Sequence, residues 1–148
     1  MFVYICLGYY EWLDFKISRE CLYQENEYID MDKKIWIAQQ ISKRIEWCGI
    51  PLNPIYCFLE KPTFRLGPAK HVICKVLVDP TNIVYFDDTL YVYLLNSTFT
   101  EKEGDEKMFT SNTSNKRAFI PYVTRNMVRK VWVYRNDKRL RGGARNTT

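Results

Sequence analysis

Histidine is almost absent from this sequence of 148 residues, in which His71 is the only one. Acid–base sites and zinc sites commonly depend on imidazole groups acting together, so both kinds of site are disfavoured. His71 opens a run that is predicted to be a buried strand, which favours a structural role for it. Glycine is scarce too, and its one cluster, Gly142-Gly143, lacks the lysine spacing of a phosphate-binding loop. We therefore predict no catalytic residue, and the sequence leans away from an enzyme.

The cysteines lack a pairing pattern. There are five, at positions 6, 21, 48, 57 and 74, and no two have the spacing of metal ligands. This usage is typical of reduced thiols, and we expect the protein in the cytoplasm of a host cell. Asp79, Asp87 and Asp88 offer oxygen ligands for a divalent cation, but turn and helix-capping roles account for them. We therefore predict neither a metal nor another cofactor.

Long apolar runs are missing as well. No run approaches the length needed to cross a bilayer, so no membrane partner is expected. The apolar start of the chain has no basic region and continues directly into Glu11 and Asp14. This pattern predicts a buried first strand rather than a signal peptide.

Acidic residues are almost absent from the last 42 positions, where Asp137 stands alone among eleven lysines and arginines. The first 106 residues are the reverse, with 16 acidic and 11 basic residues. A basic block of this kind attracts polyanions. The expected partner is therefore nucleic acid or a nucleic-acid-binding host protein.

The sequence does contain alternating β-rich and helical patterns. Runs of β-branched and aromatic residues predict strands at 2–7, 54–59, 71–78, 82–86, 119–123 and 128–134. Helices are predicted at 9–17 and at about 31–48, the second being the principal amphipathic helix, which Gly49 and Pro51 end. Residues 89–95 fit a strand or a helix, and the Asp87-Asp88-Thr89 cluster favours the helix.

These patterns predict an α+β fold with a mixed, mostly antiparallel sheet, one principal helix and one or two short helices. The length and a hydrophobic content of 47% fit a single domain over residues 1–148. Within it, residues 97–116 are predicted to form a long polar loop and residues 138–148 a flexible basic tail.

The principal helix places two indoles opposite its apolar stripe. At 100° per residue, one face carries Ile37, Ala38, Ile41, Ile45 and Cys48 and is predicted to pack on the core. Trp36 and Trp47 project to the other side, beside Lys43. One interpretation is a protein interface made by Trp36, Trp47 and Lys43. The other, which agrees with the usual burial of Trp, is a helix covered on both sides within one domain.

The strand at 128–134 and its neighbouring residues form the strongest candidate for a binding site. Cations alternate with aromatic rings there, a combination that suits a phosphate backbone and stacked bases. The predicted nucleic-acid or partner-binding residues are Arg125, Arg129, Lys130, Trp132, Tyr134, Arg135, Lys138, Arg139 and Arg141. The alternative is a solvated edge strand whose charges prevent aggregation.

Short motifs run along the first 97 residues: Ile35-Trp36 through Gln40, Lys43-Arg44-Ile45, Pro54-Ile55-Tyr56, Val76-Leu77-Val78-Asp79 and Leu94-Leu95-Asn96. Together they resemble an uncharacterised bacterial and phage family known only as a domain of unknown function, in which Trp stands where this chain has Tyr56. The arrangement is also similar to the ADP-ribosyltransferase fold. That resemblance implies an Arg or His in the first strand and a late Glu. Residues 2–7 contain neither, and no Glu follows Glu106.

Three hypotheses follow. The favoured one is a small intracellular binding or inhibitor protein of a phage or mobile element that docks on nucleic acid, or on a nucleic-acid-handling protein, through its basic C-terminal half. The second is an ADP-ribosyltransferase-like enzyme that acts on a nucleotide. The third is a homo-oligomeric structural subunit.

Overall fold

The computed structural model describes residues 1–18, 21–22, 29–47, 53–63, 70–96, 107–110, 112, 114–135 and 138–139. The fold is α+β, as predicted. The strand pairs β1–β4, β2–β7, β4–β8, β5–β6 and β8–β9, whose bounds are given below, are antiparallel. The chain divides into two compact units, and each is described by itself. Unit 1 contains Met1–Tyr23, Cys57–Asp79 and Tyr122–Thr148, and unit 2 contains Gln24–Tyr56 and Pro80–Pro121.

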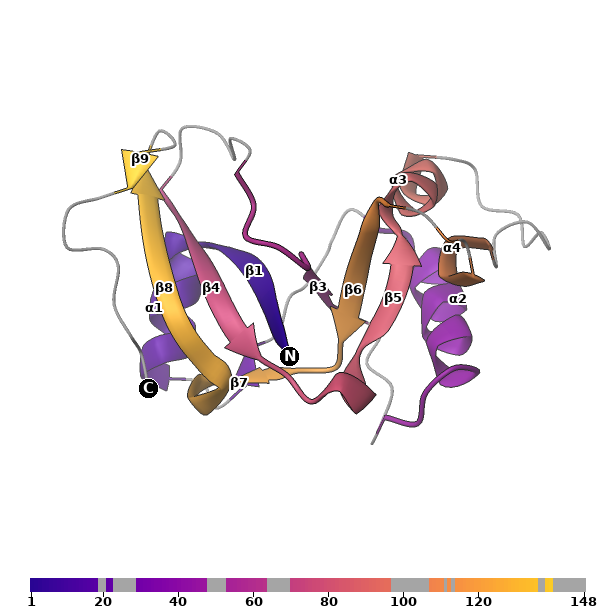
Figure 1. Ribbon diagram of the computed structural model, residues 1–148, viewed down its shortest axis with the longest axis horizontal. Helices are drawn as coiled ribbons and strands as arrows, with labels where there is room; N and C mark the ends of the chain where they lie inside the picture. Colours follow the sequence, from indigo (N-terminus) through magenta and orange to yellow (C-terminus); the bar gives the residue numbers. More distant parts are fainter. Residues whose placement is uncertain are drawn as a thin grey trace. The chain divides into compact units, whose positions relative to one another are not determined.

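Unit 1 is built on a four-stranded sheet in the order β1-β4-β8-β9. The strands are β1 (Phe2–Gly8), β4 (His71–Leu77), β8 (Val128–Arg135) and β9 (Lys138–Arg139). Helix α1 (Tyr9–Ser18) follows β1 and lies behind this sheet (Figure 1). Two short strands, β2 (Cys21–Leu22) and β7 (Val123–Thr124), pair with each other. The short 3-10 helix Arg125–Met127 follows β7 directly.

The alternation of residues in β1 gives unit 1 its core. Val3, Ile5 and Leu7 are almost fully buried, whereas the residues between them are partly exposed. Because successive side chains of a strand point to opposite faces, one face of this sheet is apolar and closed. Trp12 and Phe15 of α1 are buried as well. The other face of the sheet is free to carry polar groups.

Unit 2 contains a three-stranded sheet in the order β3-β6-β5 with helices against it. Its strands are β3 (Ile55–Cys57), β5 (Val84–Asp87) and β6 (Lys116–Ile120). Its helices are α2 (Met31–Ser42), α3 (Asp88–Asn96) and α4 (Lys107–Thr110), with a 3-10 turn at Pro80–Asn82. None of the helices in the described ranges is long and apolar enough to cross a membrane.

The ambiguous segment 89–95 is helical, as the capping cluster indicated. Oδ1 of Asp87 accepts hydrogen bonds from the backbone N–H groups of Thr89 (2.9 Å) and Leu90 (3.3 Å). These are donors that a helix leaves unpaired in its first turn, so the buried carboxylate starts α3 at this point.

Some predicted boundaries need correction. The principal helix ends at Ser42 rather than near position 48, because the Ile41 carbonyl accepts from both Arg44 and Ile45 and tightens the last turn. Helix α4 lies within the predicted loop 97–116, and residues 97–106, 111 and 113 are outside the described part. In the predicted tail, β9 pairs with β8, and residues 140–148 are outside the described part.

Candidate nucleic-acid interface

One face of the unit 1 sheet carries both lysines and aromatic rings. Residues directly opposite each other in neighbouring strands share a face, as do alternate residues of one strand. In this sheet Tyr4 lies opposite Lys75, and Lys75 lies opposite Lys130. On the side away from Val3, Ile5 and Leu7, the same register places Cys6, Ile73 and Leu77 together with the residues that we name the lysine–aromatic face: Phe2, Tyr4, His71, Lys75, Lys130, Trp132 and Tyr134.

The lysine amines of this face lie over aromatic rings. Nζ of Lys75 is 4.3 Å from the centroid of the Phe2 ring, and Nζ of Lys130 is 5.0 Å from that of Trp132. A third amine comes from Lys61, whose Nζ is 4.5 Å from the Trp132 centroid. All three distances are within the roughly 6 Å over which a cation is attracted to a ring face. The rings therefore hold positive charge against the sheet.

Lys75 and Lys130 form a like-charge pair at the centre of the face. Directly opposite like charges destabilise a sheet by up to about 1 kcal/mol. None of the residues that β1, β4 and β8 through Tyr134 place on this face is acidic. The ring contacts draw the two amines apart, Lys75 toward Phe2 and Lys130 toward Trp132, and so relieve part of the repulsion. Two amines spaced along a strand pair are suited to a ligand that carries more than one negative charge.

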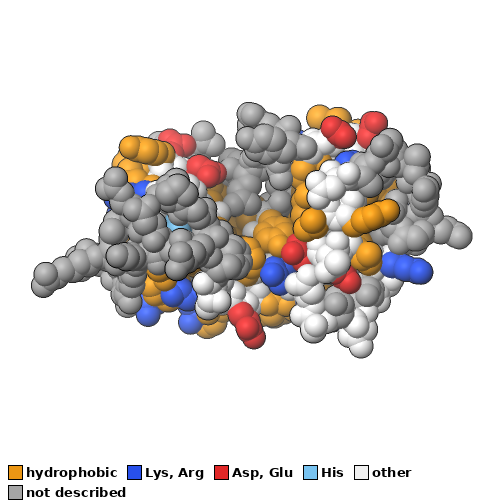
Figure 2. Space-filling view, turned by 90° about the horizontal axis from the view of Figure 1, so that it is seen from above, with side chains coloured by type: hydrophobic (Ala, Val, Ile, Leu, Met, Phe, Trp, Pro, Cys, Tyr) orange, Lys and Arg blue, Asp and Glu red, His pale blue; other side chains and the backbone are white. Residues whose placement is uncertain are grey.

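The space-filling view agrees with this description. At the lower left of Figure 2, blue side chains lie directly against orange ones. This is the side on which Figure 1 draws β1, β4 and β8. Basic groups and apolar surface therefore occur together on this part of the molecule, as a ligand with both phosphates and flat rings would require.

The lysine–aromatic face is covered at one end and open at the other. Lys61 donates a hydrogen bond from Nζ to Oη of Tyr134 at 2.7 Å and lies over Trp132, which is only 8% exposed. At the other end, Phe2 lies opposite Leu77, and their exposed fractions are 42% and 37%. A ligand in solution therefore reaches Phe2 and the central lysines more readily than it reaches Trp132.

His71 belongs to the covered end. It is buried and stacks on Tyr134, with ring centroids 5.4 Å apart and an interplanar angle of 12°. Its packing against a ring of the neighbouring strand accords with the structural role expected from the sequence.

Three of the predicted binding residues, Lys130, Trp132 and Tyr134, come together on the lysine–aromatic face. Sequence reasoning missed Phe2, Tyr4, Lys61 and Lys75. The signal for Phe2 and Tyr4 was present, because they alternate with the apolar Val3 and Ile5 in the first strand. No local pattern reveals that Lys75 faces Lys130, because that contact depends on the pairing of β4 with β8.

Other predicted residues lie elsewhere. Nη1 of Arg125 donates to the backbone oxygen of Lys16 at 3.2 Å, so this arginine caps the end of α1. Arg129 is exposed at an irregularity of the β4–β8 register, between the pairs Lys75–Lys130 and Val76–Val128. For Arg135, Lys138 and Arg139 only the backbone is described, and Arg141 is outside the described part.

Of the two interpretations of Trp36 and Trp47, the interface outside the core is wrong and burial on the core is confirmed. They are 3% and 7% exposed and belong to the hydrophobic core of unit 2. The buried face of α2 consists of Lys33, Trp36, Ile37, Gln40 and Ile41, a regular three-and-four spacing. Lys43, the third residue of the predicted protein interface, is exposed just beyond the helix.

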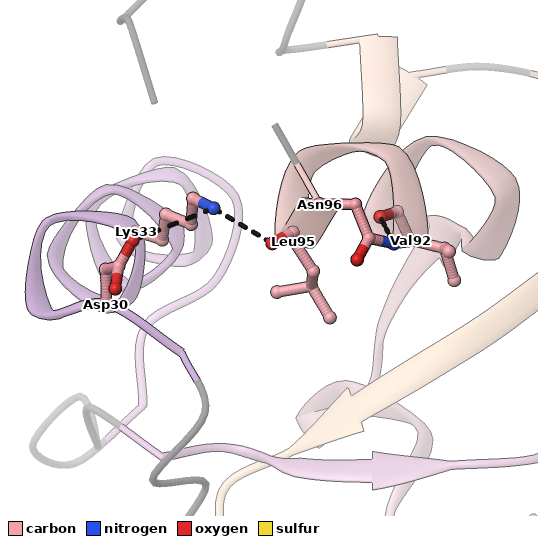
Figure 3. A network of polar contacts seen from close by, with 5 residues as sticks. All are labelled: Asp30, Lys33, Val92, Leu95 and Asn96. Atoms are coloured by element: carbon pink, nitrogen blue, oxygen red, sulfur yellow. Dashed lines mark hydrogen bonds and ion pairs between the residues drawn. The ribbon is translucent and has the colours of Figure 1, made fainter. Parts of the chain in front are cut away.

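Polar contacts explain why this face of α2 was misjudged. Lys33 is buried, and its Nζ donates to the backbone oxygen of Leu95 at 3.0 Å, near the end of α3 (Figure 3). Nη1 of Arg44 bonds both the backbone oxygen and Oε1 of Gln40. Because these polar groups have partners, they can share the face of the helix with the indole of Trp36.

A polar cluster joins the sheet of unit 2 to the start of α3. Oη of Tyr56 donates to Oδ1 of Asp88 at 2.6 Å. Burial, and then this contact with Asp88, raise the pKa of Tyr56 well above its ordinary value. The phenol therefore remains a proton donor at neutral pH and fastens the first turn of α3 to β3. The described residues contain no group of three or more potential metal ligands.

Three thiols of unit 1 have raised pKa values: Cys57 and Cys74, which are buried, and Cys6, which is partly buried. Burial raises the pKa of Cys6 to about 12 and raises the pKa values of Cys57 and Cys74 further. Because the thiolate is the reactive form, these three cysteines are poor nucleophiles at neutral pH.

No protein-family model, curated protein or solved structure matches this chain. The inference about function therefore depends on the geometry of the described residues.

Proposed function

We propose that unit 1 binds nucleic acid through the lysine–aromatic face. The observation that carries the proposal is the pair Lys75 and Lys130, which lie directly opposite each other with their amines over the rings of Phe2 and Trp132. The phosphates of a nucleic acid would neutralise these amines, and the aromatic surface beside them suits a base.

The charge distribution of the chain supports a polyanionic ligand. The eleven basic residues after position 106 include Lys130 itself, and Arg129 beside it is exposed. A field of one sign raises the local concentration of an oppositely charged polymer and speeds its association. The alternative hypothesis is docking on an acidic surface of a nucleic-acid-handling protein. Such a partner would contact the same lysines and arginines but would not need the aromatic rings.

Salt dependence tests the proposal most directly. The affinity of the full chain for fluorescently labelled oligonucleotides is measured by anisotropy between 50 and 300 mM NaCl. Each phosphate contact with a single strand contributes about 0.7 to the slope of log K against log salt. The double variant K75Q/K130Q is therefore expected to reduce the magnitude of that slope by about 1.4, equivalent to roughly 25-fold in affinity between 1 M and 0.1 M salt.

The matched control removes two charges from other places. Lys16 of α1 and Lys107 of α4 are exposed, and K16Q/K107Q changes the net charge by the same amount. The variant K16Q/K107Q should retain the larger part of the slope of log K against log salt that the unaltered protein shows. Equal effects of the two double variants, or no binding of any oligonucleotide at 50 mM salt, would reject the lysine–aromatic face as a nucleic-acid site.

A further inference from the structure

We infer that the ligand of the lysine–aromatic face is an unpaired, single strand of nucleic acid, with a base stacked on Phe2 and the adjoining phosphate at Lys75 and Lys130. This inference rests on the proposed function and specifies its ligand. It concerns the open end of the face, which the sequence did not single out.

The first argument is the accessibility of the ring. Phe2 is 42% exposed, and Leu77 opposite it leaves this end of the sheet open. In a duplex, each base is already stacked on its neighbours and paired, so a ring on the surface of a sheet has no base face to meet. A single strand can turn a base outward onto such a ring, because its bases are not held in pairs.

The second argument is the position of the charge relative to the ring. Nζ of Lys75 is 4.3 Å from the Phe2 centroid, and Lys75 lies directly opposite Lys130. A nucleotide joins a flat base to a phosphate, and here an exposed ring and the Lys75 amine are adjacent, with Lys130 on the neighbouring strand. A binding site for the phosphate backbone alone gains nothing from the ring.

The third argument excludes the more obvious indole. Trp132 is only 8% exposed, whereas Phe2 is 42% exposed. Its ring is therefore not available to a base in this conformation. The ring that a base can stack on is therefore Phe2. Tyr4 lies two residues further along the same face of the strand.

The test compares four probes on the full chain at one low salt concentration: 20-nucleotide single-stranded DNA and RNA of one sequence, and the DNA and RNA duplexes of that sequence. Both single strands, or one of them, should bind at least tenfold more tightly than the duplexes. The variant F2A should weaken single-strand binding about fivefold or more, as expected for losing one base–aromatic stack, and leave the salt slope unchanged.

The control Y10A removes an aromatic ring that is 83% exposed on α1, and it should bind like the unaltered protein. Circular dichroism verifies that F2A and Y10A are folded. Equal affinity for single strands and duplexes, or F2A binding as tightly as Y10A, would overturn the inference while a reduced salt slope in K75Q/K130Q still upheld the proposed function. Absence of binding to all four probes would instead reject the proposed function itself.

Discussion

Replacing Trp36 by alanine distinguishes the core from an interface. The indole is 3% exposed, and its centroid is 6.2 Å from that of Phe109. Truncating a buried Trp or Phe to Ala typically costs 3–5 kcal/mol, through lost burial and the cavity that remains. Because the unfolding free energy of a domain is commonly 5–15 kcal/mol, W36A should remove a large share of the stability of unit 2.

Ile35 provides the matched control on the same helix. It precedes Trp36 but is 40% exposed, so I35A should cost less than about 1 kcal/mol. Urea denaturation followed by near-ultraviolet circular dichroism gives both values, and hydrogen exchange assigns the loss to unit 2. A cost for W36A as small as that for I35A would refute the core assignment and restore the hypothesis of a tryptophan contact surface.

Three further predictions concern other buried groups. D87A should destabilise by about 1–2 kcal/mol, because two N–H groups of α3 lose their acceptor. D30A should cost less in the same urea assay, because the exposed Asp30 side chain makes no capping bond and loses only an ion pair of 3.8 Å with Lys33. K33M should cost about 1–3 kcal/mol by leaving the Leu95 carbonyl unpaired, and the control K34M, at a partly exposed position of α2, should cost clearly less in thermal melts. At pH 8 Cys6 should react with iodoacetamide roughly a thousandfold more slowly than a thiol of pKa 9.0 in an unfolded peptide, as quantified by mass spectrometry; equal rates would contradict its burial. Because folding raises the pKa of this thiol, its contribution to stability is fully present below about pH 9 and is lost as the pH rises through about 12.

Most elements of the fold were predictable, because the patterns that specify them are local. The alternation that starts at Phe2, the dense β-branched run from His71 and the capping aspartate before Thr89 each produced the expected element. The buried face of α2 was not predictable from apolar spacing. Ile37 and Ile41 fit the predicted stripe that contains Ala38, and they fit equally well the observed face that contains Trp36. The observed face also includes the buried Lys33. Burial of this lysine requires a partner for its amine, and that partner is the carbonyl of Leu95, 62 residues away in the sequence.

The candidate site shows the limit of reading charge along a chain. Of the three amines on the lysine–aromatic face, only Lys130 belongs to the basic C-terminal block, while Lys61 and Lys75 come from the net acidic part of the sequence. Antiparallel pairing of β4 with β8 brings Lys75 opposite Lys130, and none of the described strand residues on this face is acidic. Arg125, from the basic block, is instead used to cap α1. The proposed site is therefore built by the register of three strands more than by the net charge of either half of the chain.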